Sequence, residues 1–142
     1  MKPLVYVAHP FGGLIKNHKK IDKIMNELVF SDDKHVYVSP IHNYGFAYLD
    51  GDEYQRGLDV CLELLKKCDI LVICPGWEES RGCKQEVKLA IDNNIPVFLL
   101  GNWKHEVLTD KEIEHYYNFM EQRKREENEK KWKSLIIKHI ER

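Results

Sequence analysis

Long apolar runs, a surplus of positive or negative residues and closely spaced cysteine pairs are all missing here, and these missing features rule out several classes of protein. None of its apolar runs reaches the roughly 20 residues that a membrane-spanning helix requires. The formal net charge is -1, whereas proteins that follow a phosphate backbone carry an excess of Lys and Arg. We therefore expect neither a membrane nor polymeric nucleic acid as a partner.

The sequence has only four cysteines, and none of them forms a CxxC pair or has the histidine spacing of a zinc site. All four fall within predicted helices and strands or close to their ends, so we expect small, apolar, reduced side chains. They are Cys61, Cys68, Cys74 and Cys83. The apolar run Leu4–Ala8 is too short for a signal peptide. These features predict a cytoplasmic protein with no metal and no cofactor.

The 142 residues, 43% hydrophobic and 32% charged, have the composition of a globular domain with one core. Four short apolar runs predict buried strands. They are Leu4–Ala8, His35–Ser39, Ile70–Cys74 and Pro96–Leu100. Helical periodicity predicts three helices between them, at Leu14–Phe30, Tyr54–Cys68 and Ser80–Asn93. Ile41–Asp52 has no clean period, so we predict a loop there.

Strands that alternate with helices predict a flavodoxin-like α/β fold, a parallel sheet with helices on both faces and a strand order of about 2-1-3-4. We assign residues 1–104 to this domain and residues 105–142 to a charged helical extension. A capping box, Thr109 with Glu112, opens that extension, and the charged run Gln122–Lys131 interrupts its apolar stripe. Either both apolar patches pack on the domain's own sheet, or the second patch packs on a neighbouring subunit.

Ligands of such sheets bind beyond the carboxyl ends of the strands. The candidate ligand-binding loops are therefore His9–Gly13, Ser39–Asp50 and Pro75–Gly82. The third loop leads into a helix for which Ser80 suits the N-cap. Free backbone amides at that helix start favour an anion such as phosphate. Glu86 falls at the edge of the apolar stripe of this helix, so we expect a partly shielded carboxylate one turn further on.

Other candidate site residues come from the first two strands and the loops that follow them. The hydroxyl of Tyr6 needs a partner inside a buried strand, either a structural one or Glu86. The stretch HPFGG allows close backbone approach but lacks the GxGxxG and GK[ST] patterns of nucleotide loops. An aromatic ring there could stack on a base, whereas lone histidines are more often packed than catalytic. We predict substrate contacts at His9, Phe11, Gly12, His42, Ser80 and Gly82.

Four stretches together resemble the nucleoside 2-deoxyribosyltransferase-like family, most closely its small phage and bacterial members related to 2'-deoxynucleoside 5'-phosphate N-hydrolases. They are VYVAHPFGG, SPIH, RGLDVCLELLKKCD and CPGWEESRGCKQEVKLAIDNNIPV, within Leu4–Leu100. The resemblance implies cleavage or transfer of the N-glycosidic bond of a nucleoside or nucleotide. It implies that Glu86 attacks the sugar, Tyr6 holds that carboxylate and Ser80 binds a 5'-phosphate. It also implies a homo-oligomer, because a neighbouring subunit often completes the family's pocket.

The sequence departs from the family at the general acid, because Cys61 stands where these enzymes usually have an Asp. Asp59 lies two residues away on a different helix face, so it replaces that acid only if the helix is turned. The alternative is therefore a non-catalytic protein that sequesters a nucleotide-like molecule, such as a signalling nucleotide. A phospho-receiver domain ranks last because no acidic pair follows the first strand.

Overall fold

The structure is a computed structural model that describes residues 1–49 and 53–107. The chain divides into two compact units, Met1–Val97 and Phe98–Arg142. Of the predicted tail, residues 105–107 are described, whereas its capping box at Thr109 and its two apolar patches lie outside the described residues. The predicted boundary between residues 104 and 105 stays a prediction.

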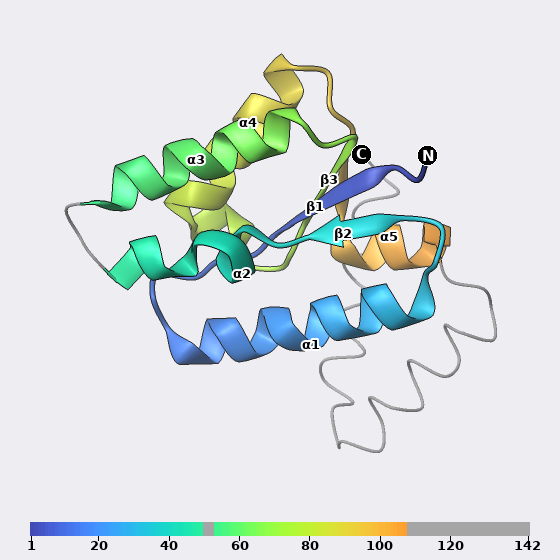
Figure 1. Ribbon diagram of the computed structural model, residues 1–142, viewed down its shortest axis with the longest axis horizontal. Helices are drawn as coiled ribbons and strands as arrows, with labels where there is room; N and C mark the ends of the chain where they lie inside the picture. Colours follow the sequence, from blue (N-terminus) through green and yellow to red (C-terminus); the bar gives the residue numbers. More distant parts are fainter. Residues whose placement is uncertain (50–52, 108–142) are drawn as a thin grey trace. The chain divides into compact units, whose positions relative to one another are not determined.

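A parallel sheet of four strands forms the centre of the fold (Figure 1), in the order β2-β1-β3-β4. The strands are β1 (Leu4–Ala8), β2 (Val36–Val38), β3 (Ile70–Ile73) and β4 (Val97–Leu99). Because β1 has a neighbour on each side, its residue Tyr6 pairs with Val38 on β2 and with Leu71 on β3. The predicted α/β class and strand order are confirmed.

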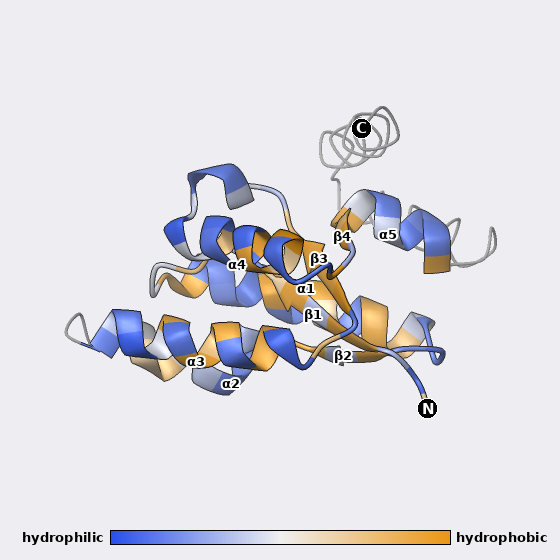
Figure 2. Cartoon of the chain, turned by 90° about the horizontal axis from the view of Figure 1, so that it is seen from above, coloured by the Kyte–Doolittle hydropathy of each residue, from blue (hydrophilic) through white to orange (hydrophobic). Residues whose placement is uncertain are grey.

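Three helices of the first unit cover the sheet. Figure 1 shows α1 (Ile15–Ser31) on one side and α3 (Tyr54–Lys66) with α4 (Arg81–Asp92) on the other. Apolar and polar residues lie on different sides of these helices (Figure 2), as amphipathic helices packed on a sheet require. The second unit begins at Phe98, within β4, and continues with α5 (Leu100–Val107). The rings of Phe98 and Trp103 lie 5.1 Å apart. No helix among the described residues combines the length and apolarity needed to cross a bilayer.

The loop predicted for Ile41–Asp52 is wrong over its described part. The helix α2 (Pro40–Tyr44) and the 3-10 helix η1 (Gly45–Leu49) occupy that segment. Ser39 caps α2, accepting a hydrogen bond from the His42 N–H at 3.4 Å, and Pro40 occupies the first turn. A single helical turn is too short to show a period, which is why the sequence pattern missed it. The other predicted elements agree with the structure to within two residues at each end.

The core lies between the central strands and the helices on both faces. Tyr6, Val5, Val7 and Ala8 of β1 are fully buried, because a central strand of a parallel sheet is covered on both sides. All four cysteines are buried and free. Gly57 lets α3 approach η1 closely, since a Cβ atom at this position would lie 2.4 Å from the Cβ of Ala47. The packing of α3 therefore depends on a residue without a side chain.

Candidate functional site

The structure brings together two of the predicted catalytic residues, Tyr6 and Glu86, which are 80 residues apart in the sequence. The Tyr6 hydroxyl donates a hydrogen bond to Oε2 of Glu86. Tyr6 is fully buried and Glu86 is 5% exposed, so the carboxyl is more deeply shielded than the helical pattern indicated. A buried carboxyl with a single phenolic donor is an arrangement that perturbs ionisation.

Burial raises the pKa of Glu86 to about 7, and the Tyr6 hydrogen bond opposes this rise by stabilising the carboxylate. Near neutral pH the side chain therefore exists in both protonation states. A carboxyl with such a pKa is suited to act as a nucleophile, a base or an acid at pH 7.

Two buried thiols lie close enough to Glu86 to sense its charge. Burial, followed by the negative charge of Glu86, raises the pKa of Cys61 and that of Cys83 to about 12 each. The Tyr6 hydroxyl hydrogen-bonds the Cys61 thiol and so lowers the pKa of that thiol in part. Cys61 of α3 thus lies beside the Tyr6–Glu86 pair and remains protonated at neutral pH.

The third predicted catalytic residue, Asp59, does not join this pair. It is exposed on α3 and accepts a hydrogen bond from Nε2 of Gln55 at 2.8 Å. Two residues correspond to about 200° around a helix, so turning Cys61 inward turns Asp59 outward. The helix is therefore not rotated in the way that would let Asp59 replace the acid.

The start of α4 has the local structure that the sequence predicts. Ser80 is the N-cap, and its hydroxyl oxygen accepts a hydrogen bond from the backbone N–H of Cys83 at 3.3 Å. Gly82 is buried in the first turn. The preceding loop turns at Gly76, whose φ of 91° favours glycine, and Pro10 lies 3.5 Å from where a Cβ of Gly76 would be. The loops that follow β1 and β3 are therefore adjacent.

Tyr54 lies close enough to Glu86 to sense its charge and was not predicted as a site residue. Burial raises the pKa of Tyr54, and the charge of Arg81 opposes this rise. The negative charge of Glu86 and of the two thiols adds to the rise. The Arg81 guanidinium lies 5.4 Å from the centre of the Tyr54 ring. Arg81 also donates to Gln55 at 2.7 Å. In the sequence Tyr54 carries only a helical-period signal, so nothing local distinguishes it from a core residue.

The loop after β1 is held by its own hydrogen bonds. His9 is 8% exposed, with Nδ1 2.6 Å from the carbonyl oxygen of Pro10. Burial lowers the pKa of His9, and the charge of Lys20 adds to this effect. Asn17 donates to the Phe11 carbonyl at 2.9 Å, and Gly12 has a φ of 60°. The loop is thus fixed in shape, with a neutral imidazole favoured at its start.

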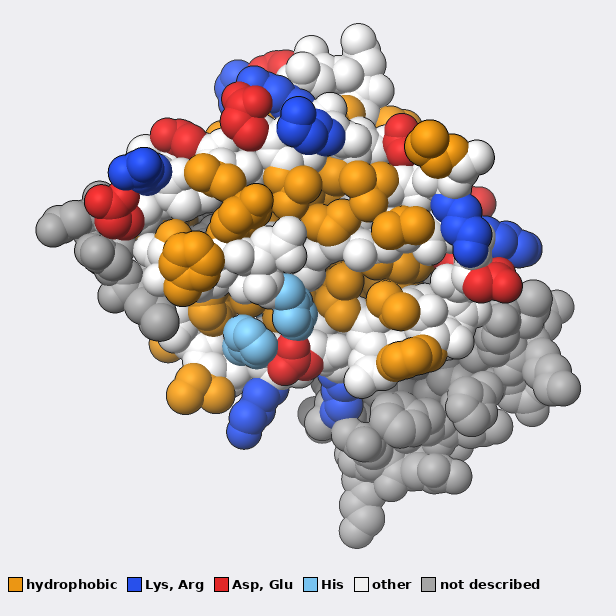
Figure 3. Space-filling model, viewed as in Figure 1, with side chains coloured by type: hydrophobic (Ala, Val, Ile, Leu, Met, Phe, Trp, Pro, Cys, Tyr) orange, Lys and Arg blue, Asp and Glu red, His pale blue; other side chains and the backbone are white. Residues whose placement is uncertain are grey.

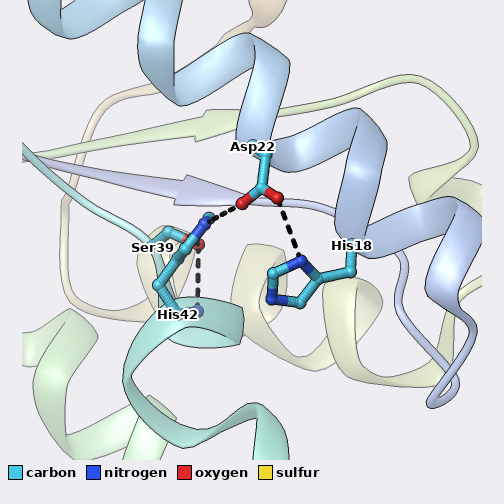
Figure 4. Close-up of polar contacts among 4 residues, drawn as sticks. All are labelled: His18, Asp22, Ser39 and His42. Atoms are coloured by element: carbon cyan, nitrogen blue, oxygen red, sulfur yellow. Dashed lines mark hydrogen bonds and ion pairs between the residues drawn. The ribbon is translucent and has the colours of Figure 1, made fainter.

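His42, the remaining predicted contact residue, lies on α2 beside a different carboxylate. Its ring bridges Ser39 and Asp22, with Nδ1 2.8 Å from the Ser39 hydroxyl and Nε2 2.5 Å from Oδ1 of Asp22 (Figure 4). His18 reaches the same carboxylate from α1. Among the described residues, His18, Asp22 and His42 form the group whose side chains could hold a metal ion.

Comparison with known proteins supports the fold. A solved structure of a 2-deoxyribosyltransferase from the psychrotolerant bacterium Bacillus psychrosaccharolyticus is similar, with a TM-score of 0.51. The two sequences are 21% identical, and the likeness covers 68% of this chain and 70% of that chain. At this identity the comparison shows a common fold. No curated protein sequence matches the chain significantly.

A family match extends over residues 3–99, from just before β1 to the end of β4. It therefore includes Tyr6, Ser80 and Glu86 together with all four strands. Since the match covers more than half of the chain, the protein belongs to the family described as a domain of unknown function (DUF4406).

Proposed function

We propose that the protein breaks the N-glycosidic bond of a nucleoside or nucleotide, with Glu86 as the nucleophile. The observation that carries this proposal is the buried Tyr6–Glu86 pair, in which a phenol orients a carboxyl whose pKa lies near neutrality. The fold likeness to a 2-deoxyribosyltransferase, described as a biocatalyst for nucleoside synthesis, agrees with it. The proposed reaction needs neither a metal nor a cofactor.

In the proposed reaction, one Glu86 oxygen attacks C1' of the sugar while the C1'–N bond breaks. The bonding electron pair passes to the base nitrogen, which takes a proton from water. Tyr6 holds Oε2, so the attack is assigned to Oε1. A water molecule, or an N–H nitrogen of a second base, then attacks C1' and releases the carboxylate, and its proton passes to the hydroxide left by the first step. Water gives hydrolysis, and a second base gives transfer.

The proposal assigns substrate binding to residues of the three loops and the helices that follow them. Ser80 and Gly82 begin a helix whose free amides attract a 5'-phosphate. Phe11 stacks on the base, and Gly12 lets the backbone approach the ligand. His9 contributes a polar contact from the loop after β1, whereas both ring nitrogens of His42 already contact Ser39 and Asp22.

Within residues 1–49 and 53–107, neither Cys61 nor Asp59 serves as a strong acid beside the nucleophile. Cys61 has a pKa of about 12, so it protonates a departing base poorly, and Asp59 faces away. General acid catalysis contributes about two to four orders of magnitude in rate, so slow turnover is expected. The same observation favours the second candidate, a protein that binds a nucleotide-like molecule and returns it unchanged.

Release of free base from a panel of ribonucleoside and deoxyribonucleoside monophosphates tests the first candidate. The wild-type protein should release base and form a glycosyl adduct on Glu86 detectable by mass spectrometry. Glu86→Gln should abolish both, whereas Glu63→Gln, at an exposed glutamate of α3, should retain them.

If the wild-type protein releases no base from any member of the panel, the enzymatic candidate is ruled out. Calorimetry on the same panel then decides the second one. A binding protein should hold its ligand tightly and release it chemically intact after heat denaturation.

The proposal also includes a homo-oligomer in the cytoplasm. The free, buried thiols are compatible with a reducing compartment. Light scattering of the full chain measures the oligomeric state, and a monomeric mass at working concentration would contradict that part.

A further inference from the structure

A second cluster of polar side chains, His18, Asp22 and His42, lies outside the Tyr6–Glu86 pair. His18 and Asp22 are one turn apart on α1, so they share a helix face, and His42 approaches them from α2. His18 Nδ1 lies 3.2 Å from Oδ2 of Asp22, and His42 Nε2 lies 2.5 Å from Oδ1. Figure 4 shows the carboxylate between the two imidazole rings, each facing one oxygen.

The three residues offer one donor atom each, and these atoms all lie within 4.8 Å of one another. A tetrahedral ion with ligands at about 2.0–2.2 Å requires neighbouring donor atoms to be about 3.3 Å apart. The direct contacts of 3.2 and 2.5 Å lie on either side of that spacing, and the three side chains are partly exposed. We propose that His18, Asp22 and His42 bind a zinc ion.

The donor set selects the kind of ion. Two imidazole nitrogens and one carboxylate oxygen suit zinc and its first-row neighbours, whereas Mg²⁺ and Ca²⁺ prefer six or more oxygens. Asp22 contributes the carboxylate oxygen of this set, and both imidazole rings already contact it.

The cluster is accessible to an ion from solvent. The three side chains are 37–50% exposed. Figure 3 shows two histidine side chains beside an acidic one on the face in view. Three protein ligands leave a fourth tetrahedral position for water or a substrate atom, as in zinc sites that exchange ligands.

Ser39 supports the cluster from behind. Its hydroxyl lies 2.8 Å from Nδ1 of His42 and holds the ring with Nε2 toward Asp22. Such outer contacts orient histidine ligands in metal sites. Ser39 is 2% exposed and also accepts the His42 backbone N–H, so its hydroxyl cannot reach a substrate. This burial argues against a hydrolytic Ser39–His42–Asp22 triad and makes Ser39 a positioning residue.

Calorimetric titration of the full chain, free of any purification tag, with Zn²⁺ tests the proposal. One ion should bind per chain, and Mg²⁺ in the same range should not. His18→Ala and His42→Ala should each weaken binding at least about tenfold, as should Asp22→Asn, which keeps the side-chain shape. His105→Ala removes an exposed histidine of α5 and should leave binding unchanged.

Co²⁺ substitution identifies the ligands independently of stability. Bound Co²⁺ should give ligand-field absorption without the intense thiolate charge-transfer band, because the cysteines are buried. Binding that survives both histidine substitutions, a thiolate band, or no Zn²⁺ binding below millimolar concentration would each overturn the proposal. Circular dichroism of every variant verifies folding. None of these measurements depends on glycosidic activity, so failure of the proposed function would leave this result unaffected.

Discussion

Two opposing effects set the pKa of Glu86: burial raises it, and the hydrogen bond from the Tyr6 hydroxyl lowers it. If Glu86 is the nucleophile, its carboxylate form attacks, so the rate of base release should rise with pH and level off above about 7. Tyr6→Phe removes the hydrogen bond that lowers the pKa, so this rising limb should move to higher pH. Initial rates between pH 5 and 9 measure both effects. A rate that falls through this range would instead assign Glu86 to acid catalysis.

The same raised pKa predicts a pH-dependent cost in stability. The folded chain retains the Glu86 proton above the ordinary pKa of 4.5, so the free energy of unfolding should fall between about 4.5 and about 7. The shift corresponds to about 3 kcal/mol at about 1.4 kcal/mol per pKa unit. Glu86→Gln keeps a neutral acceptor for Tyr6 and should be the more stable protein at pH 8 but not at pH 4.5.

Urea unfolding of wild type and variant at the two pH values measures this difference. Glu63→Gln, at an exposed site on α3, serves as the control and should show no such pH dependence. An equal effect of Glu86→Gln at both pH values would show that burial does not raise the pKa of this carboxyl.

Among the secondary-structure elements, the start of α4 offers a test of whether Ser80 has only a structural role or also binds phosphate. Two substitutions of Ser80 distinguish these roles. Ser80→Asp retains the N-cap but adds a negative charge, whereas Ser80→Ala removes the cap at a cost of about 1 kcal/mol. We expect Ser80→Asp to keep the stability and lose at least about tenfold in affinity for a nucleoside 5'-monophosphate. Calorimetry with the free nucleoside is the matched control, and equal loss for both ligands would refute phosphate binding here.

The contact of α3 with η1 should tolerate no side chain at residue 57. Gly57→Ala adds a Cβ that would lie 2.4 Å from the Cβ of Ala47. Overpacking costs about 1–3 kcal/mol, more than the gain of up to about 1 kcal/mol in helix propensity. Thermal unfolding should show the loss, and Ala47→Gly added to Gly57→Ala should recover part of it. No recovery would mean that the clash is relieved elsewhere.

For the molecule as a whole, the reactivity of the cysteines measures how well the described core excludes solvent. Burial raises the pKa of Cys61 and Cys83 to about 12 and that of Cys68 to about 11, and Cys74 is fully buried. Disulfide reagents react with the thiolate. The native protein at pH 8 should therefore react slowly, whereas all four thiols should react at once in denaturant. Rapid stoichiometric labelling of the native chain would contradict this burial.

Local patterns were sufficient to predict several features. The four apolar runs and the helical periods between them determine the parallel sheet, because right-handed crossovers leave few topologies. Ser80 was predictable as an N-cap because a cap involves residues only three apart. The one-turn helix α2 escaped prediction because a single turn has no period.

Patterns among neighbouring residues thus specify the order of elements, the class of fold and the capped start of α4. The packing of distant elements was needed to place Cys61 rather than Asp59 near Glu86, to bring the Tyr6 hydroxyl to this carboxyl, and to bring His42 to two residues of α1. The two groups of features differ in the sequence distance over which the interactions act. Periodicity and capping arise from neighbours a few residues apart, whereas the rotation of a helix and the meeting of distant side chains depend on how whole elements pack.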